Sequence, residues 1–140
     1  MIILDTNVIS ELMRPEPSPR VLGWIGKQRA IELFTTSISE AEIFYGIEIL
    51  SRGKRRDGLL ATADAIFTKD FEGRVLGFES DAARIFSQVA AHRRTLGRPL
   101  SQADGQIAAI AQEWSARLAT RNVEDFNDCG IDVVNPWANR

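Results

Sequence analysis

Three acidic residues, Asp5, Glu42 and Asp104, stand where a folded chain can gather them into one site. Carboxylates about 5 Å apart repel by roughly 3 kcal/mol per pair at an effective dielectric near 20. Such a group therefore needs either a cation or protonation of some members. Oxygen ligands suit Mg²⁺ or Mn²⁺. A site of this kind can activate water and stabilise the departing oxygen of a phosphodiester.

The first of these acids follows an apolar run at residues 2–4. The run shows no alternation, which is typical of a strand buried on both faces of a parallel sheet. Asp5 then falls at the carboxyl end of the strand, where open α/β sheets bind their ligands. A second interpretation is that Asp5 or Thr6 only caps a helix that starts near Asn7. Local sequence leaves both interpretations open.

The other two acids stand near predicted helix starts. Ser39-x-x-Glu42 has the pattern of a capping box, and Ser101-x-x-Asp104 also resembles a cap. The helix predicted over residues 37–50 follows a predicted strand, so Glu42 would project from the same edge of the sheet as Asp5. Capping and ligand binding are both compatible with these patterns.

The rest of the chain alternates between strand-like and helix-like segments. This alternation predicts one α/β domain over residues 1–140, with three layers and a mostly parallel central sheet of about five strands flanked by helices. Predicted strands cover residues 2–4, 31–36, 74–78, 118–120 and 131–134. Predicted helices cover residues 7–13, 19–28, 37–50, 59–67, 81–96 and a segment starting near 101. The parallel order brings the three acids, with the segment 122–125, to one edge.

Composition narrows the class of protein. The 140 residues are 44% hydrophobic and 26% charged, and no segment approaches a membrane span or a signal peptide, so we expect a cytoplasmic protein with no membrane contact. One cysteine, Cys129, and one histidine, His92, rule out an internal disulfide and a Cys/His zinc site within one chain. His92 itself is expected on the surface.

The formal net charge of −2 gives no global basic field for a nucleic acid. Attraction to a polyanion must come from bound cations or local basic patches. The densest basic patches are residues 52–56 and the group Arg93, Arg94 and Arg98. Each is either a solvated face or a nucleic-acid contact.

Four motifs stand in order along the chain: Asp5-Thr6-Asn7, Ala41-Glu42, Ala103-Asp104-Gly105-Gln106-Ile107-Ala108-Ala109 and Thr120-Arg121-Asn122-Val123-Glu124-Asp125-Phe126. In these motifs the chain resembles a known family, the PIN-domain ribonucleases. More narrowly it resembles VapC-type toxins of bacterial toxin–antitoxin pairs, and most of all the FitB-like branch, through the segment 4–15 and the ending 134–137. The resemblance covers nearly the whole chain.

The resemblance implies a PIN-like fold and a Mg²⁺- or Mn²⁺-dependent endoribonuclease. Asp5, Glu42 and Asp104 match the family's metal-binding acids. Members often carry an acid where this chain has Asn122, so the fourth catalytic position is filled by Asn122 or by Asp125. The hydroxyls of Thr6 and Thr120 would assist. The resemblance also implies a homodimer, a cognate antitoxin of ribbon-helix-helix type, RNA as substrate, and operator DNA bound only through the antitoxin.

Two alternatives belong to other classes. A phosphatase of the haloacid-dehalogenase type also begins with an apolar strand and an aspartate, but it needs a second aspartate where this chain has Asn7. A noncatalytic PIN-fold module would bind within a DNA-bound regulatory complex, but it has no need to retain the three acids. Nucleotide-binding enzymes are disfavoured because the chain has neither a glycine-rich dinucleotide fingerprint nor a P-loop.

Overall fold

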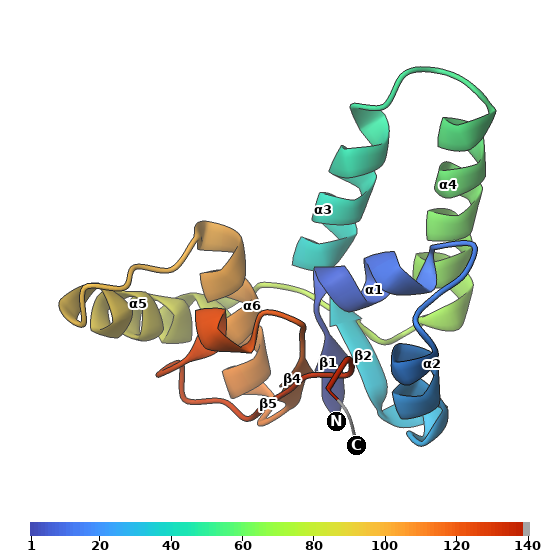
Figure 1. Ribbon diagram of the computed structural model, residues 1–140. Coiled ribbons are helices and arrows are strands. Elements are labelled where there is room, and N and C mark those ends of the chain that lie inside the picture. Colours follow the sequence, from blue (N-terminus) through green and yellow to red (C-terminus); the bar gives the residue numbers. More distant parts are fainter. Residues whose placement is uncertain (139–140) are drawn as a thin grey trace.

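The structure is a computed structural model that describes residues 1–138. Within these residues, a single sheet contains five strands, all parallel: β1 (Ile2–Leu4), β2 (Leu33–Thr36), β3 (Val75–Leu76), β4 (Arg117–Ala119) and β5 (Val133–Val134). The strand order is β3-β2-β1-β4-β5, so β1 lies at the centre between β2 and β4 (Figure 1). The predicted mostly parallel sheet of about five strands is confirmed.

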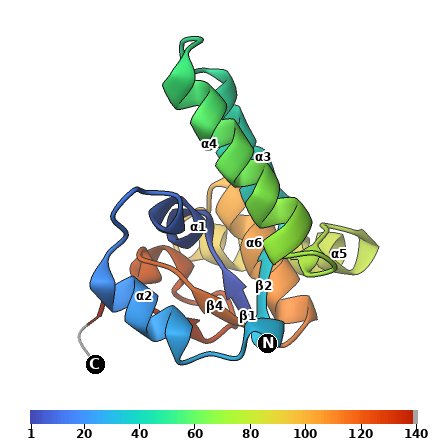
Figure 2. The same ribbon diagram turned by 90° about the vertical axis from the view of Figure 1, so that its right-hand side faces the viewer.

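Six α-helices connect and cover these strands in the described part of the chain. They are α1 (Thr6–Leu12), α2 (Pro19–Gly26), α3 (Ser37–Glu48), α4 (Lys54–Ala65), α5 (Ser80–Thr95) and α6 (Gln102–Glu113). Two 3₁₀ turns, η1 (Ala30–Glu32) and η3 (Val123–Phe126), and a π-helical segment, η2 (Ile66–Asp70), complete the path. Helices α3 and α4 form a hairpin that projects away from the sheet (Figures 1 and 2).

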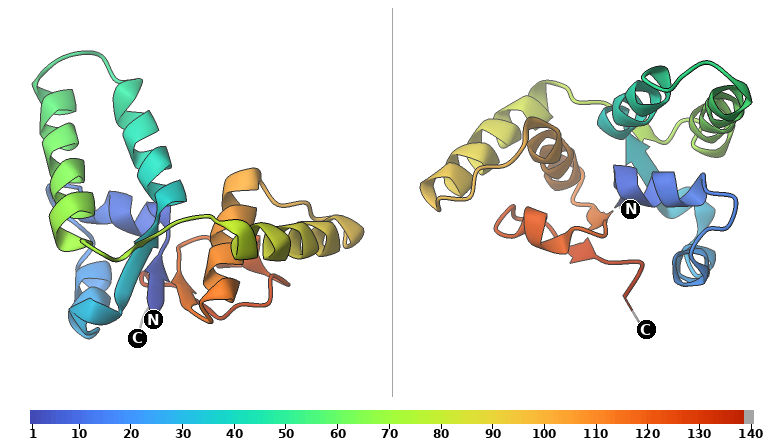
Figure 3. Two further views of the ribbon diagram at one scale, coloured as in Figure 1. Left: turned by 180° about the vertical axis from the view of Figure 1, so that it is seen from behind. Right: turned by 45° about the horizontal axis from the view of Figure 1, so that its top comes forward.

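The central strand packs against helices on both of its faces. Ile2 and Leu4 belong to a core with residues of α1 to α4, whereas Ile3, which points the other way, packs with residues of α5 and α6. The two groups of helices lie on opposite sides of the sheet (Figure 3). This burial on both faces explains the apolar run without alternation and confirms the three-layer prediction.

Polar side chains at the strand ends determine where the next helices begin. Asp5 caps α1 by accepting a 2.8 Å hydrogen bond from the backbone N–H of Thr6. Ser101 caps α6 in the same way, accepting from the N–H of Asp104 as its sequence pattern predicted. Helix α1 ends at Leu12, one residue before the predicted end, and the proline-rich turn 14–19 follows.

The capping-box interpretation of Ser39 and Glu42 is wrong. The N-cap of α3 is Thr36, the last residue of β2, and its hydroxyl accepts from the N–H of Ser39 at 3.1 Å. Because the helix begins at Ser37, Glu42 lies in its second turn, beyond the reach of the free N–H groups. The predicted strand at residues 31–36 is also shorter, since Ile31 lies in a 3₁₀ turn and is 63% exposed.

Close packing of α5 on α6 fixes the start of α6. A Cβ atom at Gly105 would lie 2.7 Å from Cε1 of Phe86, so any larger residue here would force the Phe86 ring or one of the two helices to move. At the end of α5, Gly97 has a φ of +74° and ends the helix as predicted. No helix in residues 1–138 is both long and apolar enough to cross a membrane.

Candidate active site

Polar residues from three neighbouring strands meet at the carboxyl edge of the sheet. Asp5 follows β1, Thr36 ends β2, and Thr120 follows β4. Because β2, β1 and β4 are adjacent in the sheet, the helices that follow β1 and β2 start beside each other. The parallel topology therefore brings together residues that are more than a hundred positions apart in the chain.

Asp5 lies at the centre of this edge and is only 5% exposed. Its Oδ1 accepts from the N–H of Thr6, and its Oδ2 accepts a 2.7 Å hydrogen bond from the hydroxyl of Thr120. The Thr120 hydroxyl in turn accepts from the side-chain amide of Asn7 and from the N–H of Asn122. Asp5 thus serves as a helix cap through one oxygen and joins a buried polar network through the other.

Glu42 reaches the same place from α3. The hydroxyl of Thr6 donates to Oε1 of Glu42 at 2.6 Å and lies 2.9 Å from the hydroxyl of Ser39. Thr6 is therefore the link between the first turn of α1 and the second turn of α3. The side chain of Glu42 is exposed, so this carboxylate remains accessible to a ligand.

Asp104 comes from the first turn of α6 and is half-buried. Burial raises the pKa of Asp104, and the negative charges of Asp125 and Glu42 raise it further. Burial also raises the pKa of Asp5, with added repulsion from Asp104 and Glu42, against the hydrogen bond from Thr120. Asp5, Glu42 and Asp104 all line one cleft, so the fold brings the three acids together at this edge of the sheet.

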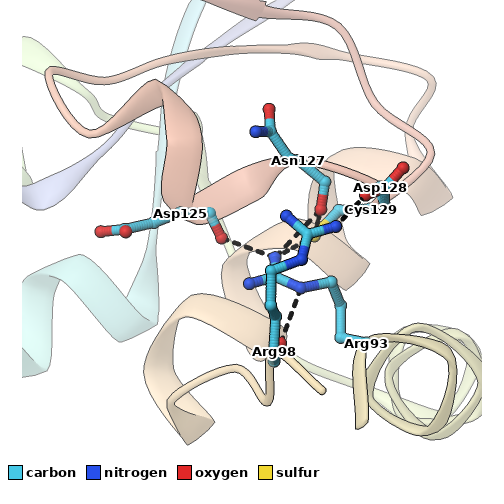
Figure 4. A network of polar contacts seen from close by, with 6 residues as sticks. All are labelled: Arg93, Arg98, Asp125, Asn127, Asp128 and Cys129. Atoms are coloured by element: carbon cyan, nitrogen blue, oxygen red, sulfur yellow. Dashed lines mark hydrogen bonds and ion pairs between the residues drawn. The ribbon is translucent and has the colours of Figure 1, made fainter. Parts of the chain in front are cut away.

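The two candidates for the fourth position both lie near Asp104 but differ in placement. Asn122 lines the same cleft as Asp5, Glu42 and Asp104. Asp125 does not line this cleft, although its charge acts on Asp104. In Figure 4 the carboxylate of Asp125 points away from the guanidinium of Arg93, while the carbonyl of Asp125 accepts from it. Asn122 therefore lies in the cleft with the acids, and Asp125 lies close enough for its charge to act on Asp104.

Arg93 is the anchor of this region rather than part of a surface patch. It is 5% exposed, and its Nη1 donates to the carbonyls of Asp125 (2.7 Å) and Asn127 (3.0 Å), while Nε donates to the carbonyl of Arg98 (Figure 4). The predicted basic surface group is therefore wrong for Arg93, whose position on the buried side of α5 removes it from solvent. Arg98 remains exposed but pairs with Asp128. The sulfur of Cys129 lies 3.5 Å from Nη1 of Arg93, and burial raises the pKa of this thiol.

The acids line a cleft of about 480 Å³. Sequence reasoning assigned no role to several other residues that line it: Asn7, Ser10, Glu11, Arg14, Arg121 and Trp137. Asn7 positions the network, since its amide donates to Thr120 and its carbonyl oxygen accepts from the N–H of Arg121. In the sequence, Asn7 stood out only as the last member of the Asp5-Thr6-Asn7 motif, and nothing in that motif indicated its hydrogen bonds to Thr120 and Arg121.

A larger and mostly apolar groove of about 790 Å³ adjoins this cleft. It lies between α1, α3 and α4, and it shares Thr6, Ser10, Arg14 and Glu42 with the acidic cleft. Apolar residues of the groove include Met13, Ile43, Ile47, Leu50 and Leu59. A partner lying in the groove would therefore reach the acids.

The fold and the site together define a class of protein. Its members are three-layer α/β domains with a parallel sheet and with acidic residues gathered at the carboxyl edge of that sheet. The chain belongs to the PIN-domain family, because the sequence profile of the PIN domain matches residues 2–130.

Similar proteins cover almost all of the chain. VapC ribonuclease Y4jK of Sinorhizobium fredii is 39% identical over 137 residues, which span 98% of each chain. Toxin FitB of Neisseria gonorrhoeae is 36% identical over 137 residues, 98% of this chain and 99% of FitB. In the solved structure of FitAB bound to an IR36 DNA fragment, one chain matches with a TM-score of 0.93 and 36% identity, covering 100% of this chain and 98% of that one.

Proposed function

We propose that this protein is a metal-dependent endoribonuclease, the toxin of a toxin–antitoxin pair. The observation that carries the proposal is the convergence of Asp5, Glu42 and Asp104 on one cleft, with the pKa values of Asp5 and Asp104 raised. Such a cluster costs stability unless a ligand compensates it. Similarity to VapC ribonuclease Y4jK and Toxin FitB supports the same activity.

The donor set of the cleft fits Mg²⁺ or Mn²⁺. Its acidic ligands are all carboxylate oxygens, which such hard cations prefer. Among the described residues, no group of three His, Cys, Asp or Glu side chains is already arranged to hold an ion. Mg²⁺ usually keeps several waters and binds one or two carboxylates, so direct contact with all three acids is not required. Asp5, Glu42 and Asp104 are the residues that would hold the ion, directly or through water.

A bound ion of this kind would supply an activated water and charge stabilisation for the leaving oxygen. The protein's own groups would orient that chemistry. Thr120 and the N–H of Thr6 fix both oxygens of Asp5. Thr6 holds Glu42 toward the cleft, and the amide of Asn122 or the carboxylate of Asp125 would contact a water or the substrate from the η3 side.

The proposal includes a cognate antitoxin of ribbon-helix-helix type, which would bind operator DNA on behalf of the complex. The solved structure of FitAB bound to an IR36 DNA fragment supports a partner through which the complex binds DNA. The apolar groove between α1, α3 and α4 is the surface on this chain best suited to an antitoxin segment, because it ends at the acids. A homodimer is also part of the proposal.

The test is cleavage of a mixed RNA pool by the purified protein with Mn²⁺ or Mg²⁺. A chelator control and the Asp5→Asn variant run beside it. We expect cutting that requires both the metal and Asp5. Cutting that persists in the chelator, or in a folded Asp5→Asn protein, would overturn the metal site.

No cutting by a folded protein that binds the metal would instead favour the noncatalytic PIN-fold module. Membership of the PIN-domain family leaves the haloacid-dehalogenase alternative without support.

A further inference from the structure

We propose that Arg121, laid on the ring of Trp137, binds a phosphate of the RNA strand next to the acidic cleft. This inference rests on the proposed function and adds a substrate contact to it. The guanidinium carbon of Arg121 lies 5.1 Å from the centroid of the Trp137 ring. Both residues line the acidic cleft.

Both partners of this pair are held through their backbones. Arg121 follows Thr120 directly, and its N–H donates to Oδ1 of Asn7 at 3.3 Å. The N–H of Trp137 donates to Oδ1 of Asn135 at 2.9 Å, and Trp137 is partly buried against the core. The guanidinium thus lies over an aromatic ring that is itself packed against the core, an arrangement in which the ring attracts the cation.

Charge pairing separates Arg121 from the other arginine of the cleft. Arg14 lies 3.4 Å from the carboxylate of Glu11, which is buried and also accepts from the N–H of Ser18 at 2.7 Å. Arg121 is exposed and forms no ion pair with any residue from 1 to 138. Its donors are therefore available to an anion.

The position of Arg121 between two hollows favours one kind of anion, a phosphate of a nucleic-acid strand. A third hollow, of about 430 Å³, also lies beside the acidic cleft, and both are lined by Glu11, Arg14, Arg121 and Trp137. Arg121 therefore stands on the boundary between the two hollows. A single strand whose scissile phosphodiester lies at the acids has to continue past such a boundary, and a guanidinium fork matches a phosphate in charge and geometry.

The binding test compares the two ends of strand β4. Labelled single-stranded RNA is titrated by fluorescence anisotropy with Mn²⁺, at several salt concentrations, in the Asp5→Asn background. We expect Arg121→Gln to raise the Kd about tenfold at low salt, as for loss of one charge-assisted hydrogen bond. The slope of log Kd against log salt should fall by about 0.7. Arg117→Gln is the matched control, because Arg117 is also exposed but lies at the start of β4, at the opposite edge of the sheet from the acids.

A second readout uses the ring itself. The chain has three tryptophans, so replacing two of them (Trp24→Phe and Trp114→Phe) leaves Trp137 as the only source of tryptophan fluorescence. RNA should change its fluorescence, and Arg121→Gln should shift that titration to higher RNA concentration. In the cleavage-competent protein, Arg121→Gln should raise KM far more than it lowers kcat.

Affinity and salt slope that match those of Arg117→Gln would overturn the phosphate contact. Failure of the proposed function looks different. If the wild-type protein binds RNA through Arg121 but never cuts it, the phosphate contact is supported and the proposed nuclease activity is wrong. If the wild-type protein cuts RNA while Arg121→Gln changes neither KM nor the salt slope, the nuclease activity is supported and only the phosphate contact is wrong.

Discussion

The hydroxyl of Thr120 donates a 2.7 Å hydrogen bond to Oδ2 of Asp5, across 115 positions of the chain. Thr120 is fully buried, and the same hydroxyl accepts from the amide of Asn7 and the N–H of Asn122. One hydroxyl therefore ties the first strand, the first helix and the turn after β4 to a single buried carboxylate.

Removing this hydroxyl should cost stability and activity together. Thr120→Val keeps the shape but leaves Oδ2 of Asp5 and the amide of Asn7 without their partner, at about 1–3 kcal/mol of unfolding free energy. Urea denaturation measures the loss, and RNA cleavage should fall in parallel. Thr120→Ser keeps the hydroxyl and is the control. Equal losses in the two variants would show that packing of the methyl group, not the hydrogen bond, matters.

Acidification should stabilise the metal-free protein through Asp104. Because burial and neighbouring charges raise the pKa of Asp104 in the folded state, the folded protein disfavours its ionised form. Stability from this group is complete below its ordinary pKa near 4 and is lost as the pH rises through the raised value.

Asp104→Asn cannot ionise, so in chelator its melting temperature should exceed that of the wild type at neutral pH. The difference should shrink toward about pH 4. Thermal melts across this range check it. If the difference in melting temperature grew on acidification, the pKa of Asp104 would be lowered in the folded protein and not raised.

Binding of Mn²⁺ should reverse the cost of gathering the acids. At a hundred times its Kd, a ligand of the folded state adds about 2.7 kcal/mol to the unfolding free energy. Glu42→Gln and Asp104→Asn should each weaken Mn²⁺ binding in calorimetry and reduce this stabilisation. Glu113→Gln, at the other end of α6, provides a matched loss of charge. Affinities unchanged by the first two variants would remove these residues from the site.

Local sequence predicted the parts of the site that depend on local rules. The buried run before Asp5 and the Ser101 cap need only strand burial and the geometry of one helix turn, and both are confirmed. The capping role given to Ser39 and Glu42 failed because Thr36, three residues earlier, supplies the cap. The patterns Thr36-x-x-Ser39 and Ser39-x-x-Glu42 share Ser39, so the sequence alone does not tell which of the two begins the helix. The choice depends on where strand β2 ends.

Long-range contacts were beyond the reach of the sequence pattern. Arg93 looked like part of a basic surface, but two of the three backbone carbonyls that accept from it, those of Asp125 and Asn127, lie more than thirty residues later in the chain. Arg121 and Trp137 meet only because the chain returns past the end of β4. Backbone acceptors and stacking partners of this kind are set by the tertiary path and not by residue spacing.

The buried guanidinium of Arg93 should be a major support of the turn that carries Asp125. Arg93→Met fills similar space but leaves the carbonyls of Asp125, Asn127 and Arg98 without this donor, so we expect a loss of at least about 2 kcal/mol. Arg94→Met, on the exposed neighbour, should lose roughly 0.5 kcal/mol or less. Urea denaturation compares the two, and limited proteolysis should show faster cutting between residues 122 and 129 only in the first. Equal stability of the two variants would mean that α5 and α6 hold this turn without the guanidinium.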